Sequence, residues 1–354
     1  MYPIFTIVHR TRRSFLSLGR TALHWCKWTF RRRAWFILPA LFLVSACEGR
    51  QSVLDPSGAD ARRLYDLALV LFVGAAVLWL LVGGLFVYVT RINPRAMSRR
   101  AAEALIIGGG VILPVVLLGG LLIYSLPLMS AQRSAPDGMR IHVTAEQWWW
   151  RVEYELPDGS RVTSANELRL PVGQRTGLVL NAQNVIHALW IPALGGKADM
   201  IPGRETYLSF LPEKVGIFRG QCAEFCGASH ALMAFEAVTM TPDAFAEWLD
   251  AQAKDALVPE TPAAIRGAEV FAREGCGACH TVRGTPATGL VGPDLTHVGG
   301  RVSLGAGILG VTIDDFANWL GHTDALKPEV DMPTYDFLSQ DDLIALAAYL
   351  EGLK

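Results

Sequence analysis

Two long runs without a charged residue constrain this chain more than any other feature of its sequence. The first covers residues 67–89 and the second covers residues 104–132. A helix needs about 20 apolar residues to cross the roughly 30 Å hydrocarbon core of a bilayer, so each run is long enough. Apolar residues make up 51% of the chain and charged residues only 18%, which excludes a mostly disordered protein. The sequence therefore predicts two membrane spans rather than two buried helices of a soluble protein.

The segment between the two runs predicts their orientation. It holds Arg91, Arg95, Arg99 and Arg100, and short loops rich in arginine stay on the cytoplasmic side of the membrane. Both ends of the hairpin then face outward. Everything after about residue 133 is expected to form a globular part outside the cytoplasm.

The N-terminal residues 1–46 have the pattern of an export signal. A basic stretch ends at Arg33, and the apolar run 34–46 that follows is too short to span a bilayer as a helix. Cys47 directly after Ser45 and Ala46 resembles the cleavage box of bacterial lipoproteins, which implies cleavage before Cys47 and lipidation of its thiol. Plain cleavage, or no cleavage, remains the alternative.

The run C-G-A-C-H at residues 276–280 is the attachment signature of c-type haem. In such sites the thiols of Cys276 and Cys279 add to the haem vinyl groups, and His280 supplies the proximal nitrogen. Disulfides are a general alternative for cysteines in an exported domain, and a thioredoxin-like redox pair is another. The adjacent histidine and the absence of a βαβ pattern favour haem.

A class I cytochrome c also needs a distal iron ligand, usually methionine. Met332 is the only methionine after the haem motif, and Pro333 stiffens the loop that presents its sulfur. His297 and His322 are the rival distal ligands. Two capping-box signatures followed by apolar-periodic stretches predict a small helical domain over residues 262–354.

A second cluster has the spacing C-x3-C-x3-H-x2-M and consists of Cys222, Cys226, His230 and Met233. Thiolate, imidazole and thioether are soft ligands that suit copper in an electron-transfer site. One cysteine would indicate a mononuclear blue-copper centre, whereas two can bridge a pair of copper ions. Such a pair requires a second imidazole, for which His187 is the candidate. A Cys2His2 zinc site is the alternative, and Met233 speaks against it.

These residues lie in segments that resemble subunit II of cytochrome c oxidase. The resemblance covers roughly residues 64–249, including the hairpin, and the appended haem domain makes the chain similar to subunit II of a caa-type oxidase. The segments that carry it are G-Q-C-A-E-F-C-G-A-S-H-A-L-M at 220–233, N-V-I-H-A-L-W-I-P at 184–192, G-K-A-D-M-I-P-G-R at 196–204 and E-Q-W-W-W-R-V-E-Y at 146–154.

The resemblance implies a binuclear copper centre, CuA. Its implied ligands are the bridging thiolates of Cys222 and Cys226, the imidazoles of His187 and His230, the weak thioether of Met233 and the weak backbone carbonyl of Glu224. The carboxylate of Glu224 is implied to face a Mg²⁺ site at the border with subunit I. Trp148 aligns with the family's electron-entry tryptophan, whereas packing is the better interpretation of Trp149 and Trp150.

The function implied by the resemblance is a one-electron relay within a terminal oxidase that translocates protons. A donor, either cytochrome c or a bc1-type complex, reduces haem c, and electrons pass to CuA and on to subunit I, which reduces oxygen to water. Subunits I and III are the implied partners, and this chain performs no oxygen chemistry itself. The alternative is the CuA and haem c subunit of another haem–copper enzyme, such as a nitric oxide reductase. A quinol oxidase that has lost its copper is disfavoured because no ligand is missing, and no nucleic-acid motif occurs.

The expected architecture is a multidomain membrane protein of the bacterial inner membrane, with its globular domains on the periplasmic side. Glycines that punctuate the copper motif predict a loop between strands. Glu103 stands about one turn farther from Pro114 than the family's proton-entry glutamate, so its role in proton uptake stays open. The expected parts are a signal at 1–46, a two-helix transmembrane hairpin at 60–132, an all-β cupredoxin sandwich at 138–240, a helix and linker at 241–261 and an all-α class I cytochrome c domain at 262–354.

The net charge of −1 is the sum of a basic N-terminal part and an acidic C-terminal part of the chain. Residues 1–133 carry a net +11, and residues 134–354 carry a net −12. The positive part suits export and a cytoplasmic loop. The negative part is expected to attract a basic electron donor over long range.

Overall fold

The structure is a computed structural model that describes residues 48–94, 97–130, 132–133 and 139–354. Residues 50–354 form one compact unit. The expected signal sequence and Cys47 lie outside the described residues. Every contact reported below is within the unit 50–354.

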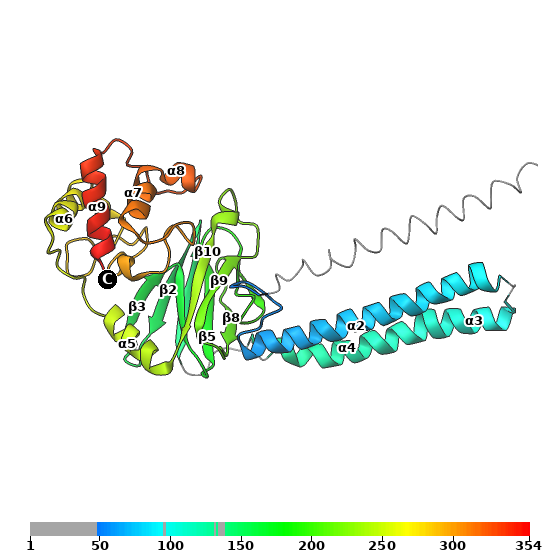
Figure 1. The fold of residues 1–354 in the computed structure, drawn as a ribbon. Helices are drawn as coiled ribbons and strands as arrows, with labels where there is room; N and C mark the ends of the chain where they lie inside the picture. Colours follow the sequence, from blue (N-terminus) through cyan, green and yellow to red (C-terminus); the bar gives the residue numbers. More distant parts are fainter. Residues whose placement is uncertain (1–47, 95–96, 131, 134–138) are drawn as a thin grey trace, which may run out of the picture. The chain divides into compact units, whose positions relative to one another are not determined.

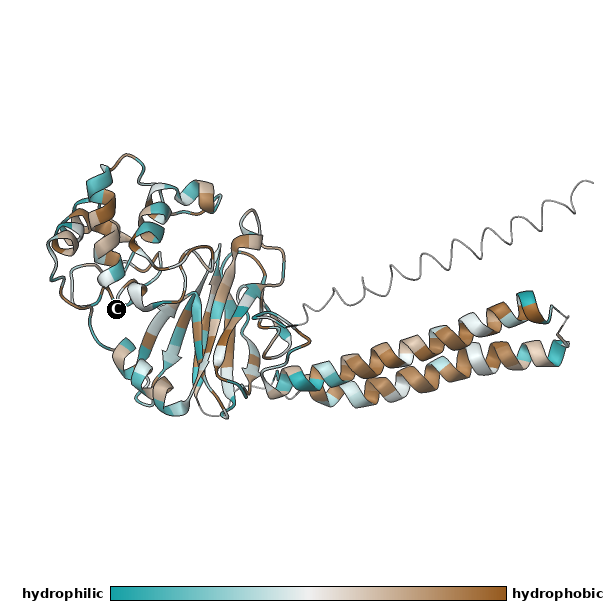
Figure 2. Cartoon of the chain, viewed as in Figure 1, coloured by the Kyte–Doolittle hydropathy of each residue, from teal (hydrophilic) through white to brown (hydrophobic). Residues whose placement is uncertain are grey.

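The hairpin consists of two long apolar helices that pack side by side (Figures 1 and 2). The first is α2 (Ala59–Val87), which continues as the π-helical turn Tyr88–Ile92, and the second comprises α3 (Arg99–Ile107), the π-helical turn Gly108–Ile112 and α4 (Leu113–Ser130). Large apolar side chains such as Phe72 and Ile123 are 75% exposed. Apolar surface of this extent needs lipid around it, so the two predicted spans are confirmed as helices that suit a membrane.

Both helices begin before the uncharged runs, and their first turns contain charged residues. Asp60 in the first turn of α2 is 1% exposed and pairs with Arg175 of the sandwich at 3.0 Å. Glu103, in α3, pairs with Arg99 one turn earlier at 2.7 Å. The π-helical turn before Pro114 has a local cause, since proline cannot donate to the preceding turn and its ring displaces a carbonyl.

The middle of the unit is a sandwich of two five-stranded sheets (Figure 1). One has the order β3-β2-β1-β5-β8 and the other β4-β10-β9-β6-β7. Inward side chains of both sheets form one core, with Trp150 and Tyr154 from the first sheet and Leu189 from the second. The strands are β1 (Arg140–Glu146), β2 (Trp149–Glu155), β3 (Arg161–Ala165), β4 (Glu167–Pro171), β5 (Thr176–Ala182), β6 (His187–Trp190), β7 (Lys197–Met200), β8 (Thr206–Phe210), β9 (Gly216–Cys222) and β10 (Ala234–Met240).

One local prediction needs correction. The glycines before Cys222 lie inside strand β9 rather than in a loop, and the loop begins only after that cysteine. Gly220 is required there because a Cβ atom would lie 2.1 Å from the ring of Phe235 on the paired strand β10. A glycine in a strand can thus mark close packing instead of a turn.

The C-terminal part is helical. It follows α5 (Pro242–Gln252), which has the predicted N-cap Thr241 and begins at Pro242, and the linker 253–261. The helix α9 packs on α6 and α7 around a second core. The elements are α6 (Pro262–Arg273), the 3₁₀ turns Cys276–Ala278 and Val298–Gly300, α7 (Ile313–Gly321), α8 (Thr323–Leu326) and α9 (Gln340–Gly352).

Candidate functional site

Five side chains of the copper motif meet at one end of the sandwich. His187 begins β6, Cys222 ends the neighbouring strand β9, and the loop that follows carries Cys226, His230 and Met233. The two sulfurs of the cysteines lie 3.7 Å apart. The Nδ1 atom of His187 lies 3.7 Å from the sulfur of Cys222, and the Nδ1 atom of His230 lies 3.5 Å from that of Cys226. Each imidazole therefore faces its own thiol.

Burial supports a metal centre rather than a surface cluster. The ligand atoms of His187, Cys222 and Cys226 lie within 4.8 Å of one another, and all three residues are buried. The Met233 sulfur lies 3.9 Å from that of Cys226. The Nε2 atom of His187 is buried without a partner. This donor set fits soft, thiolate-binding copper ions.

The two thiols share a hydrogen bond. This bond lowers the pKa of Cys222, which accepts it, and it raises the pKa of Cys226, which donates it and is also desolvated by burial. Metal binding requires thiolates and releases their protons. The second thiol is therefore expected to ionise only when a cation enters.

Glu224 and Trp148 flank this cluster. The backbone carbonyl of Glu224 lies 3.1 Å from the Cys222 sulfur, and its side chain is exposed. Trp148 is 5% exposed and donates its indole N–H to the carbonyl of Cys226 at 3.1 Å. Trp150 lies in the sandwich core and packs on Phe235, which agrees with the packing role expected for it.

The haem motif opens onto a cavity of about 570 Å³, which lies in the range of cofactor sites. Cys276 is the first residue of the 3₁₀ turn that follows α6, and Cys279 is its C-cap. The Nδ1 atom of His280 donates to the carbonyl of Pro293 at 2.8 Å. Burial lowers the pKa of His280. The imidazole is thereby kept neutral and oriented, as a metal-binding histidine must be.

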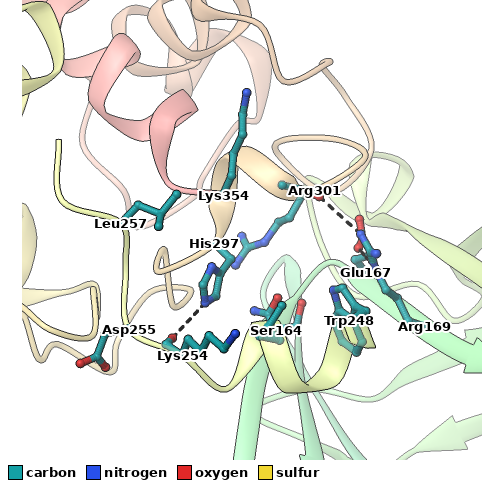
Figure 3. Close-up of a pocket in the computed structure, with 13 residues that line it drawn as sticks. Ser164, Glu167, Arg169, Trp248, Lys254, Asp255, Leu257, His297, Arg301 and Lys354 are labelled. Atoms are coloured by element: carbon teal, nitrogen blue, oxygen red, sulfur yellow. Dashed lines mark hydrogen bonds and ion pairs between the residues drawn. The ribbon is translucent and has the colours of Figure 1, made fainter. Parts of the chain in front are cut away.

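The three candidates for the distal position lie in different surroundings. Met332 lines the same cavity as His280. His297 instead lines a smaller cavity of about 290 Å³ and bonds to the carbonyl of Lys254 at 3.0 Å (Figure 3). His322 is exposed and lies 3.3 Å from the carbonyl of Asn318.

Two buried polar atoms without a partner border the haem cavity. They are Nε of Arg301 and Oγ of Ser303. A buried polar group is normally hydrogen-bonded, so these atoms indicate that a polar ligand group belongs beside them. Carboxylates such as the propionates of haem suit this requirement.

The cavity is also walled by the sandwich, which the sequence did not indicate. Trp148 and Gln147 line it together with residues of the haem motif. Further contacts join the two domains, among them the hydrogen bond from the backbone N–H of Val302 to the buried carboxylate of Glu167 at 2.7 Å. Glu167 also pairs with Arg169 at 2.6 Å, beside the smaller cavity (Figure 3).

Comparisons with known proteins match both globular domains. The family described as "Cytochrome C oxidase subunit II, periplasmic domain" matches residues 158–239, and the family "Cytochrome c" matches residues 264–354. The chain is similar to cytochrome c oxidase subunit 2 of Alkalihalophilus pseudofirmus, with 31% identity over 90% of this chain and 96% of that protein. It is also similar to the protein of the same description from Bacillus subtilis, with 31% identity over 88% and 94% of the two chains.

Among solved structures, the chain is similar to the periplasmic domain of subunit II of cytochrome oxidase of Bradyrhizobium japonicum. The identity is 31%, the match covers 34% of this chain and 96% of that one, and the TM-score is 0.32. A subunit of a heme-copper terminal oxidase dimer matches at 20% identity over 39% and 99% of the two chains, with a TM-score of 0.31.

Proposed function

The chain belongs to the cytochrome c oxidase subunit 2 family, and from this premise we propose that it relays electrons from a donor through haem c and CuA to subunit I. The single observation that carries the proposal is the meeting of His187, Cys222 and Cys226 ligand atoms within 4.8 Å, on a chain that also holds a haem motif. The chain is a subunit of an oxidase, and its two matched domains imply copper and haem c. When bound, copper and haem c each accept and donate one electron at a time.

The chain's own residues would hold the copper ions. Cys222, Cys226, His187 and His230 would be the main ligands, and Met233 and the Glu224 carbonyl would be weak ligands. Strand ends and a short loop carry these groups, so the sandwich fixes their positions relative to one another.

The haem group would be held covalently by Cys276 and Cys279, and His280 and Met332 would bind its iron. A histidine and methionine pair favours a high reduction potential. Trp148 would connect the two centres, because it lines the haem cavity and donates its N–H to a residue that carries a copper ligand.

We further propose the assembly in which the relay operates. The hairpin would place the globular domains on the periplasmic side, and the exposed Glu224 carboxylate would contribute to a Mg²⁺ site against subunit I. Subunit III would complete the complex, and cytochrome c or a bc1-type complex would be the donor. Arginines of the hairpin loop and the exposed apolar helices support this orientation.

A pair of methionine variants tests the assignment of two separate centres. In the complex purified from membranes, Met233→Leu is expected to shift the potential and electron paramagnetic spectrum of copper and to leave the haem c bands unchanged. Met332→Leu is expected to do the reverse. Wild-type protein without copper, or a Met233→Leu variant that loses its haem band, would contradict the proposal, as would purification without a large haem–copper subunit.

A further inference from the structure

The cytochrome domain holds both ends of the copper loop. Ser229, which is fully buried and directly precedes His230, donates its hydroxyl to the carbonyl of Pro328 at 2.6 Å. Ala234, which directly follows Met233, donates its backbone N–H to the carbonyl of Ala306 at 3.1 Å. The segment with two of the proposed copper ligands is therefore fastened at each end to a different loop of the cytochrome domain.

Lys327 ties these two loops together. It directly precedes Pro328, and its ammonium group donates to the carbonyl of Gly305 at 2.9 Å. Gly305 in turn directly precedes Ala306. The hydrogen bonds and the chain thus form a closed ring that runs from the copper loop through both cytochrome loops and back.

Burying the side chain of Lys327 costs free energy, because its ammonium group loses its hydration. Its residue is 2% exposed, and no carboxylate among the described residues acts on its charge. A buried ammonium group without a carboxylate costs free energy that an apolar side chain of similar length would avoid. What an apolar side chain lacks is a directional N–H bond, which fixes the distance between the two loops.

Lys327 also lies between the two proposed centres. It lines the haem cavity, and it is close enough to Cys226 for the two groups to interact electrostatically. Met332 follows five positions after Lys327 on the same loop. A shift of this loop would therefore move the distal haem ligand relative to the copper loop.

We propose that Lys327 is a positioning residue that locks the Met332 loop to the copper loop and so sets the rate of electron transfer between the two centres. The inference rests on the proposed function and goes beyond it, because it assigns the alignment of the centres to one bond in the seam between the domains.

The test replaces Lys327 by Met in the full complex, with Lys354→Met as the matched control. Lys354 is exposed and pairs with Glu351. Hydrogen exchange at residues 229–240 reports on the Ala234 N–H without reference to activity. Rapid photoreduction of haem c measures the internal transfer rate, and copper and haem spectra report loading.

Lys327→Met is expected to load both centres, to exchange faster at residues 229–240, and to transfer electrons about tenfold more slowly, since small misplacements of reacting groups can cost up to about a hundredfold. Lys327→Arg, which keeps a donor, is expected to recover part of the rate, and Lys354→Met to match wild type. Should Lys327→Met fail to assemble, Ser229→Ala, which opens the ring at its other end, decides by the same measurements.

Unchanged exchange and an unchanged transfer rate in Lys327→Met, or in Ser229→Ala if it is the one that assembles, would overturn the inference. A uniform fall in stability without a slower internal transfer would also overturn it, because that result indicates a structural role alone. Absence of copper or haem c from the wild-type protein would instead refute the proposed function.

Discussion

Replacing Gly292 by alanine is expected to disturb the proximal side of the haem site while leaving the covalent attachment intact. A Cβ atom at Gly292 would lie 2.5 Å from Cε1 and 2.8 Å from Nδ1 of His280, where ordinary contacts begin at 3.4 Å. The ring or the backbone must therefore shift by about 0.9 Å. The ring is fixed on one side by its 2.8 Å bond to the Pro293 carbonyl, and the Gly292 N–H donates to the Cys279 carbonyl at 2.8 Å.

Either shift breaks one of these hydrogen bonds. Overpacking costs about 1–3 kcal/mol, and a lost hydrogen bond costs about 0.5–1.5 kcal/mol. The free energy of unfolding of the cytochrome domain should therefore fall by roughly 2–4 kcal/mol. With an m-value of about 2 kcal/mol/M in urea, the midpoint falls by about 1–2 M.

The assay is urea unfolding followed by the haem absorption band, with haem staining of a denaturing gel to confirm covalent attachment through Cys276 and Cys279. Gly300→Ala is the matched control, because its new methyl group would meet its nearest neighbour at 3.8 Å. A Gly292→Ala midpoint equal to that of this control would refute the argument, since the ring would then have free space to move.

Three further predictions concern other parts of the chain. Asp342 receives hydrogen bonds from Arg266 and Arg273, and the bond from Arg266 does most to lower its pKa. Asp342→Asn should therefore destabilise the cytochrome domain at pH 7. In thermal melts, the difference in stability between the variant and wild type should shrink as the pH falls below 3.8. Asp60→Asn removes the charge that binds Arg175 at the base of α2, so the sandwich should lose about 1.5–3 kcal/mol in a melt followed by the copper band. Oxidation of a basic donor by the acidic globular part should slow as salt rises from low to high concentration, and stopped-flow rates independent of salt would exclude electrostatic steering.

The two motif clusters could be predicted from the sequence because their spacing is local. The residues from Cys222 to Met233 lie on one strand end and one loop, and Cys276 to His280 on one turn. Only His187 and Met332 come from farther along the chain. Both could still be found, since the chemistry of each site requires one more ligand of a particular type.

The contacts between the domains could not be predicted in this way. Ser229 meets Pro328 across 99 positions of the chain, and Glu167 meets Val302 across 135. No periodicity or spacing records such a contact, because each partner is an ordinary residue of its own domain. A lysine such as Lys327 is normally expected on the surface. Only the packing of the two domains shows that it is buried.

The same limit explains the one error in the copper segment. Glycine in a sequence indicates either a turn or a place where another group approaches closely. At Gly220 the approaching group is the ring of Phe235, which the neighbouring strand brings there. The choice between the two meanings depends on a partner that is not adjacent in the chain.

In the proposed relay, the linker 253–261 between α5 and α6 makes electron transfer between the two centres a step within one chain. Because the hydrogen bonds of Ser229 and Ala234 also dock the cytochrome domain on the sandwich, this step needs no diffusional encounter, whatever the amount of protein in the membrane. Transfer within the chain is then a first-order process that no competitor dilutes. Only the encounter with the donor remains bimolecular, so abundance and diffusion of that donor govern the flow of electrons into the enzyme.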